Sequence, residues 1–327
     1  MKNSLFLLGA AAIAALSSCS QSEVMEVAEN RAIGFNTFVN NNTRAVTEIT
    51  TDSLSKFYVF GDYDDGASVA FNNTEVGGAS GGTYTPVNLA YWQTSKTYEF
   101  GAYSNGNVDQ LTASFSNGAL TISDYSVDNT KDLIAATASD VAAPAAAGEE
   151  KNVPLTFKHL LSKVKFTFST SAVPEAFRME VSNLKFSGIK TAATCVFSNN
   201  AISTDWSGTD GEYSIATLGD YAVTKGSAST EDILVIPQAN TGIKASFTVT
   251  IYDQATDKQI ATNDFTASLA CTEWVEGNVY NYTAEINPDD VDDQMKEIKF
   301  TVTKVEEWQP DQEKPITPQE KPITPEK

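Results

Sequence analysis

The feature that most constrains this fold is a series of short segments rich in the strand-forming residues Val, Thr, Tyr and Phe, from residue 31 to about residue 305. Examples are KFYVFGDY (56–63), SKVKFTFS (162–169) and ASFTVTIYD (245–253). Clusters of Gly, Asn, Asp and Pro separate them, which is typical of strands joined by turns. No segment after residue 20 has apolar residues at helical spacing. The sequence therefore predicts an almost all-β protein.

The spacing of these segments predicts two domains. The chain has 327 residues, enough for two cores, and the loop-like stretch APAAAGEEKNVP (143–154) stands near its middle. We expect a boundary near residue 157, with one β-sandwich over 19–157 and a second over 158–287. An acidic connector and one more strand follow in 288–308. The Pro-rich tail, 309–327, is expected to be extended and solvated.

The N-terminus predicts export. Lys2 precedes an apolar run from Leu5 to Leu16, which is too short to span a bilayer and indicates a signal peptide over 1–18. The run ends in Leu-Ser-Ser-Cys19, which is similar to the lipobox of bacterial lipoproteins. Cys19 is therefore the expected lipid-bearing residue, and its lipid is expected to attach the protein to the membrane before maturation. The alternative is an ordinary signal peptide that happens to contain a cysteine.

Charge and cysteine content limit the partners. The formal net charge of -20 repels phosphate backbones, so nucleic acid is not expected as a partner. Export permits a disulfide between Cys195 and Cys271, but free cysteine is a common small core residue, which favours two unpaired thiols. No cysteine spacing typical of zinc is present, and no cofactor is expected.

No pattern in the sequence indicates an enzyme. GASGG (78–82) matches the Gly-x-Ser-x-Gly nucleophile motif around Ser80, but the residues after Ser80 are typical of a loop and not of the required helix. His159, the single histidine, is expected to be structural, with ring nitrogens bonded to backbone. The acidic clusters lack calcium-loop spacing, so no metal site is expected. Four residues could form a sugar platform but are more typical of core packing: Trp92, Trp206, Trp274 and Trp308.

One apolar segment stands directly before an exposed loop. In RAIGFNTFVNNNTRAV (31–46), Ile33, Phe35 and Val39 form the apolar face of a strand, and the adjoining loop contains Arg44. On these residues alone, the segment is a permanent edge strand and Arg44 an uncut loop residue.

Several motifs together resemble the fimbrillin family, the pilin subunits of type V fimbriae. They are YWQTSKTYEFGAYS (91–104), FKHLLSKVKFTF (157–168), DILVIPQ (232–238), WVEGNVYNYTAEI (274–286) and IKFTVTKVEEW (298–308). The resemblance implies two transthyretin-like, Greek-key β-sandwich domains in tandem. It also implies export as a lipoprotein to the outer membrane and assembly into a cell-surface fimbria used in adhesion and colonisation. The tail beyond Trp308 departs from the family pattern.

The resemblance also implies a maturation step. An extracellular Arg-specific protease would cut after Arg44, with Arg31 as second choice because it precedes the strand. Segment 31–44 would then leave with Ile33, Phe35 and Val39, and a strand from another subunit would fill the groove. Ile298, Phe300 and Val302 repeat the apolar alternation and are the expected donor strand. Asp-Ser-Leu (52–54) resembles an O-glycosylation motif at Ser53.

Two functions remain in competition at this point. The first is a structural fimbrial subunit that partners other fimbrial subunits, in the role of stalk, tip or anchor. The second is a monomeric surface lipoprotein that keeps its lipid and binds glycan or a host protein. The identity of any surface ligand is left open.

Overall fold

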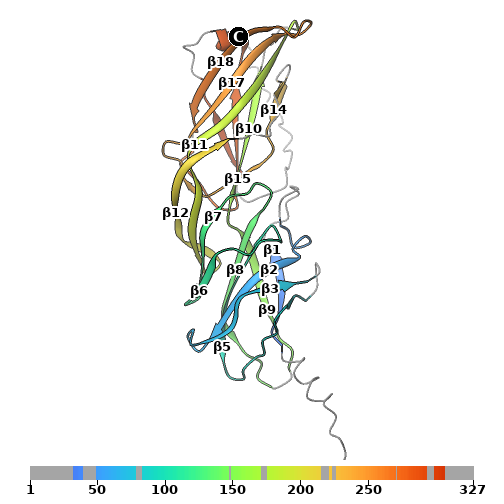
Figure 1. Ribbon diagram of the computed structural model, residues 1–327, viewed down its shortest axis with the longest axis vertical. Helices are drawn as coiled ribbons and strands as arrows, with labels where there is room; N and C mark the ends of the chain where they lie inside the picture. The colour runs from blue at the N-terminus through green and yellow to red at the C-terminus, as the bar shows by residue number, and fades with distance from the viewer. Residues whose placement is uncertain are drawn as a thin grey trace, which may run out of the picture.

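The computed structural model describes residues 32–39, 49–78, 83–146, 149–170, 175–214, 221–222, 226–269, 271–292 and 298–305. These residues form an elongated molecule with two halves stacked along its long axis, the blue and cyan strands in one half and the orange and red strands in the other (Figure 1). Nearly every regular element is a strand, which confirms the predicted all-β class. None of the helical residues described forms a segment long and apolar enough to cross a membrane.

The N-terminal half contains the strands β1 (Gly34–Val39), β2 (Lys56–Tyr63), β3 (Ser68–Gly77), β4 (Thr85–Pro86), β5 (Thr97–Asn105), β6 (Ala113–Ser116), β7 (Ala119–Ser126), β8 (Leu133–Ala142) and β9 (Asn152–His159). Seven of them form one sheet in the order β1-β9-β8-β5-β2-β3-β4. All pairs in this sheet are antiparallel except β1 with β9, which is parallel.

The two edges of this sheet meet. Phe35 in β1 forms an antiparallel bridge with Tyr84, the residue just before β4. The sheet therefore closes on itself like a barrel, and its inner face makes one core. The largest buried members of that core are Phe35, Phe57, Tyr84, Trp92, Tyr98, Phe100 and Phe157.

The C-terminal half contains the strands β10 (Ser162–Thr170), β11 (Phe177–Ser198), β12 (Ala201–Ser214), β13 (Tyr221–Ala222), β14 (Gly226–Ser229), β15 (Ile233–Val235), β16 (Gln238–Ala239), β17 (Lys244–Asp253), β18 (Gln259–Ser268), β19 (Glu273–Trp274), β20 (Val279–Glu285) and β21 (Thr301–Val305), with the short helix α2 (Pro288–Asp292). One sheet has the order β14-β10-β20-β21, and β15 also pairs with β10. A second sheet contains β18, β17 and β11.

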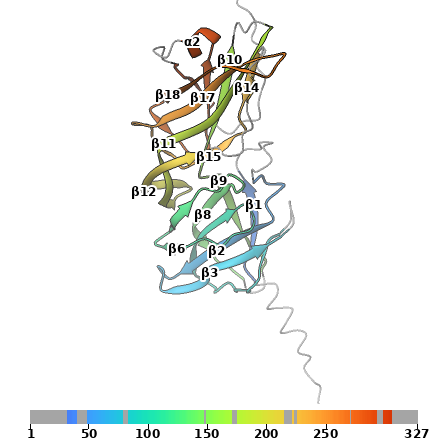
Figure 2. The same ribbon diagram turned by 45° about the horizontal axis from the view of Figure 1, so that its top comes forward.

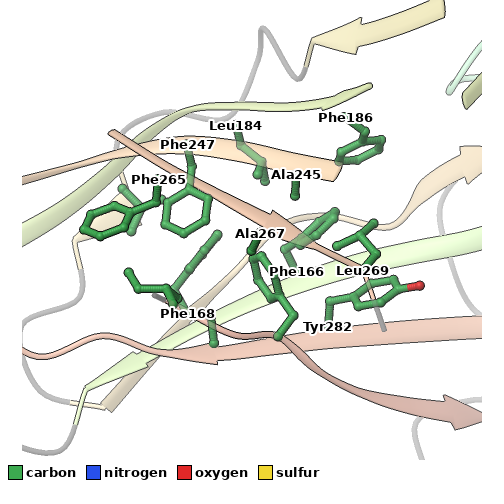
Figure 3. Close-up of a cluster of buried hydrophobic side chains, with 14 of the residues drawn as sticks. Phe166, Phe168, Leu184, Phe186, Ala245, Phe247, Phe265, Ala267, Leu269 and Tyr282 are labelled. Carbon is green, nitrogen blue, oxygen red and sulfur yellow. The ribbon is translucent and has the colours of Figure 1, made fainter. Parts of the chain in front are cut away.

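These two sheets pack face to face around a second core. Phe166 and Phe168 from β10 and Tyr282 from β20 face Phe247 from β17 and Phe265 from β18 (Figure 3). The alternation in SKVKFTFS produces this arrangement, because every second side chain of β10 points between the sheets. This half is a β-sandwich.

The strand β11 joins the two halves. It has 22 residues: Phe177–Ser187 pair with β17, while Ala192–Ser198 pair with β7 of the N-terminal half. Gly188, at φ +75°, marks a register shift between these parts. The course of β11 from one half toward the other can be followed in Figures 1 and 2. The halves therefore share a hydrogen-bonded sheet as well as a covalent connection.

A third core lies where the halves meet. It combines Tyr58 and Tyr103 on the outer face of the barrel with Ile122, Cys195 and Trp206 from the shared sheet. The predicted boundary at residue 157 falls inside β9, where Phe157 is fully buried in the barrel. The chain passes to the second half at Leu160 and Leu161, which belong to this third core. A single sequence boundary cannot separate the two halves, because β7, from the N-terminal part of the chain, pairs with β11, which continues into the C-terminal half.

Candidate assembly site around the first strand

The strand β1 lies in a slot between two other parts of the chain. On one side its residues run in register with β9, from Gly34 opposite Asn152 to Val39 opposite Phe157. On the other side the Ile33 N–H donates to the Ala90 carbonyl at 2.8 Å. We call this space, between β9 and residues 84–91, the β1 slot. β1 is the edge strand of the sheet order, as the residues alone suggested, and on its free side it is bridged at Ala32 to Tyr91 and at Phe35 to Tyr84.

The apolar face of β1 fills the slot. Ile33, Phe35 and Val39 are each 0% exposed, as the alternation predicted. The Phe35 ring lies 5.8 Å from that of Phe57 and 5.9 Å from that of Phe100, both edge-on. Such pairs add to the gain from burial. On the outer face Phe38 is 52% exposed, so β1 contributes to the core through one face only.

The chain on the far side of residues 40–48 has attachments of its own. The Ile49 N–H donates to Asp132 Oδ2 at 3.0 Å, and the same oxygen lies 2.9 Å from His159 Nδ1. Asp132 is 0% exposed and His159 4% exposed. The predicted structural role of His159 stands, but its Nδ1 partner is a carboxylate and not the predicted backbone group. A buried carboxylate needs such hydrogen-bond partners. Asp132 thereby holds Ile49, the first described residue of the segment that leads into β2, and no residue of β1 takes part in this contact.

A single hydroxyl connects β1 to that downstream chain. The Val39 N–H donates to Thr51 Oγ1 at 3.0 Å, and this hydroxyl donates back to the Val39 carbonyl at 3.2 Å. The two ends of the 40–48 stretch are therefore held close together.

Three predicted processing residues lie outside the described part of the chain: Cys19, Arg31 and Arg44. Ser53 is described and lies in an exposed turn, where its Oγ accepts from the Thr50 N–H at 2.7 Å. Its modification stays a prediction.

The predicted donor strand packs inside its own molecule. Ile298 is 5% and Phe300 4% exposed in the C-terminal core, and Val302 packs against the same core. The Phe300 ring lies 5.5 Å from Phe166 and 5.8 Å from Phe247. The strand β21, which begins at Thr301, pairs with β20. Any use of this segment as a donor requires it to leave these contacts, a step that the sequence did not reveal.

Cys195 and Cys271 are free thiols. Cys195 is buried in the third core, whereas Cys271 packs against the core of the C-terminal half. Burial raises the pKa of the Cys195 thiol to about 12. The disulfide considered from sequence is not formed, because the two side chains belong to different cores.

The described side chains offer little support for a sugar platform or a metal centre. Trp92, Trp206 and Trp274 are 2%, 5% and 2% exposed, so none presents its ring face to solvent. The Trp92 indole N–H donates to the Lys151 carbonyl at 3.1 Å, and that of Trp274 donates to Tyr282 Oη at 2.9 Å. Trp308 and Ser80 lie outside the described residues. Within the described ranges, no group of three or more His, Cys, Asp or Glu could hold a metal ion.

Comparison with known proteins identifies related sequences and folds. The profile of the fimbrillin-like family matches residues 43–308, so the match begins after β1 and ends at Trp308, before the Pro-rich tail. The search of curated protein sequences gave no match.

Solved structures from two Bacteroides species have a similar fold. A fimbrial protein from Bacteroides vulgatus is 18% identical, with a TM-score of 0.58 over 85% of this chain and 99% of that one. A candidate cell-adhesion protein from Bacteroides uniformis is 17% identical, with a TM-score of 0.50 over 85% and 99%. At these identities the likeness concerns the fold. The family match covers most of the chain, and this protein therefore belongs to the fimbrillin-like family.

Proposed function

We propose that this protein is a structural subunit of a cell-surface fimbria, exported as a lipoprotein on Cys19, cut after Arg44 and assembled by donor-strand exchange. Family membership supports the fimbrial role. The observation that carries the assembly step is the β1 slot, in which one short strand supplies three fully buried side chains while the chain beyond residue 48 is held separately by Asp132. Removal of β1 leaves that attachment in place.

The free energy of burial in the slot supports the proposed assembly. Burial of Ile33, Phe35 and Val39 contributes on the order of 5–8 kcal/mol at usual values per side chain. Loss of β1 also leaves the edge of β9 that faced β1, and the backbone of Tyr84, without hydrogen-bond partners, which favours addition of a new strand. A contact between the slot of one subunit and a strand of the next is heterologous, and its repetition gives an open fibre.

The C-terminal segment is the proposed strand that this subunit gives to its neighbour. It lies at the sheet edge, bonded only to β20 among the described strands, so it can separate without breaking a central strand. When this segment leaves, Ile298 and Phe300 lose their buried contacts in their own core. That cost in free energy is offset when the same side chains become buried in the slot of another subunit.

The test is the N-terminus of the protein on producing cells. We expect protein sheared from the surface to begin at Ala45 and to migrate in heat-labile ladders. An Arg44→Ala variant is expected to stay cell-bound and outside the ladders, while Arg31→Ala serves as the matched control and still enters them. A sheared protein that begins at lipid-modified Cys19 and runs as a monomer would instead establish the surface-lipoprotein function.

A further inference from the structure

We infer that the β1 slot accepts a strand from a different subunit and not the C-terminal strand of a second copy of this chain. The inference rests on the proposed function, since it concerns which strand replaces β1. It depends on the side chains that the slot buries and on the residues that this chain could offer.

The slot has three strict positions. Residues 33, 35 and 39 are each 0% exposed, with residue 35 surrounded by the rings of Phe57, Phe71 and Phe100. An incoming strand that restores the core must place an uncharged apolar side chain at all three, because an unpaired charge in such a site carries a large desolvation cost. Position 35 favours an aromatic ring, since a smaller side chain leaves a cavity among these rings.

Position 34 adds a steric condition. A Cβ placed on Gly34 would lie 2.5 Å from Asn152 Oδ1 and 3.3 Å from Thr83 Cγ2. The Asn152 amide is itself bonded to Asn36 Oδ1 at 3.3 Å. Glycine therefore enters this position without displacing a neighbour, whereas a larger residue must move the end of the Asn152 side chain, whose partner Asn36 leaves together with β1.

The direction of the incoming strand is also defined. Phe35 and Tyr84 exchange two backbone hydrogen bonds, Phe35 N–H to the Tyr84 carbonyl at 3.1 Å and Tyr84 N–H to the Phe35 carbonyl at 2.9 Å. Such a doubly bonded pair belongs to antiparallel pairing. A strand that runs in the direction of β1 restores both bonds.

The C-terminal strand of this chain fails the conditions in its best register. With Phe300 at position 35, Ile298 occupies position 33, but Lys304 falls at the fully buried position 39. Lys299 then takes the place of Gly34, against Asn152.

The other registers of 296–308 are no better. Moving the strand so that Val302 fills position 39 puts Lys296 at position 33, and moving it so that Val302 fills position 35 puts Glu306 at position 39. In every register in which residues of 296–308 fill all the positions from 33 to 39, a Lys or Glu falls at position 33, 35 or 39. Reversal of the strand has the same result: with Phe300 at position 35, Lys296 falls at position 39.

The partner strand is therefore defined by its chemistry. It carries an aliphatic residue, glycine, an aromatic residue, three residues without strict demands, and a second aliphatic residue, with no charge at the buried positions. This chain contains that pattern in its own β1, Ile33-Gly34-Phe35 followed by Val39, and not in its C-terminal strand. A fibre containing this protein therefore has a second kind of subunit at its slot.

The experiment measures exchange of strands into the slot. The purified chain without its signal peptide is nicked with an Arg-specific endoprotease. The sequence has three arginines, and Arg178 is held in β11 by Asp257 and lies 4.1 Å from the Tyr252 ring centre. A labelled peptide of residues 32–44 is bound to the nicked protein near its unfolding temperature, and unlabelled peptides compete for the slot in fluorescence anisotropy.

Three competitors decide the outcome. We expect the native peptide 296–308 to compete at least about 100-fold more weakly than unlabelled 32–44, given the cost of a buried charge. The same peptide with Lys299→Gly and Lys304→Val matches the slot pattern and is expected to compete within about tenfold of 32–44. The peptide with Lys299→Gly and Lys304→Glu is the matched control, which keeps a charge at position 39 and should stay weak.

Two contrary results are distinguishable. Equal competition by native 296–308 and by 32–44 would overturn this inference while leaving the slot intact. Failure of 32–44 itself to exchange in protein shown to be cut after Arg44 would overturn the proposed assembly mechanism as a whole.

Discussion

Phe35 and Tyr84 exchange two backbone hydrogen bonds, and this pair closes the N-terminal sheet into a barrel. Tyr84 is in turn fixed by its own hydroxyl, which donates to the Leu54 carbonyl at 2.6 Å. The β1 slot therefore has one wall, β9, made by regular pairing and another at Tyr84, whose hydroxyl bond to Leu54 does not involve β1. We expect this hydroxyl bond to hold Tyr84 in place when the occupant of the slot changes.

Phe35 is the side chain whose loss should matter most within β1. Phe35→Ala removes a fully buried ring in contact with three others and should reduce the free energy of unfolding by about 3–5 kcal/mol. Urea denaturation of the uncut protein measures this change. Phe38→Ala, on the exposed face of the same strand, is the control and should change it by less than about 0.5 kcal/mol. Equal effects of the two substitutions would contradict the assigned faces.

Asp132 should decide whether the chain after residue 48 stays attached. Asp132→Asn weakens the buried contacts to the Ile49 N–H and to His159, and we expect a loss of about 2–4 kcal/mol in unfolding free energy. Hydrogen exchange should show faster exchange of the Ile49 amide. Asp128→Asn, whose carboxylate is 43% exposed beside Lys131, provides the comparison with a small effect. Unchanged protection of Ile49 would remove Asp132 from the attachment.

The two thiols of the folded domains should differ in reactivity. Burial raises the pKa of Cys195 to about 12, so at pH 8 it is a protonated, inaccessible thiol. Cys271 is only partly buried. Titration of protein lacking Cys19 with a disulfide reagent should show one fast thiol, lost in Cys271→Ser, and a second that reacts only on unfolding. Two fast thiols in the folded protein would contradict the burial of Cys195.

Lys163 should make stability depend on pH. Burial lowers the pKa of its ammonium group to about 8, and the contact with Asp232 at 3.8 Å compensates only in part. Between pH 8 and about 10 the unfolded chain binds more protons at this residue than the folded chain, so the free energy of unfolding rises with pH. The Lys163→Met variant should lack this rise, and the difference between the two proteins should shrink as pH increases. A constant difference over this range would exclude a depressed pKa.

The sequence pattern predicted the buried face of β1 correctly, because this strand has one buried face and a regular alternation, and it predicted β10 as a strand. The partner of His159 could not be predicted, since Asp132 is 27 residues away and pairs with it only after β8 and β9 align. The length of β11 was hidden for a similar reason: register shifts on both sides of Gly188 interrupt the alternation that marks a strand.

The C-terminal strand shows a different limit of prediction. Ile298, Phe300 and Val302 alternate in the way needed to fill a slot, and the same alternation lets them pack against β10 and β17 of their own molecule. A periodicity identifies which side chains seek burial but not which core receives them. Lys299 and Lys304 argue against this chain's own slot as the receiving core, but this can be seen only when the buried positions of the slot are known.

The shared strand β11 has a mechanical consequence for a fibre under tension. Its residues pair with β17 along the C-terminal half and with β7 along the N-terminal half, so the backbone ladders continue across the junction. A pull transmitted from one end of the subunit to the other loads many of these bonds together in shear, and does not open them one after another. In the fibre proposed above, we expect the body of each subunit to resist extension along its long axis for this reason.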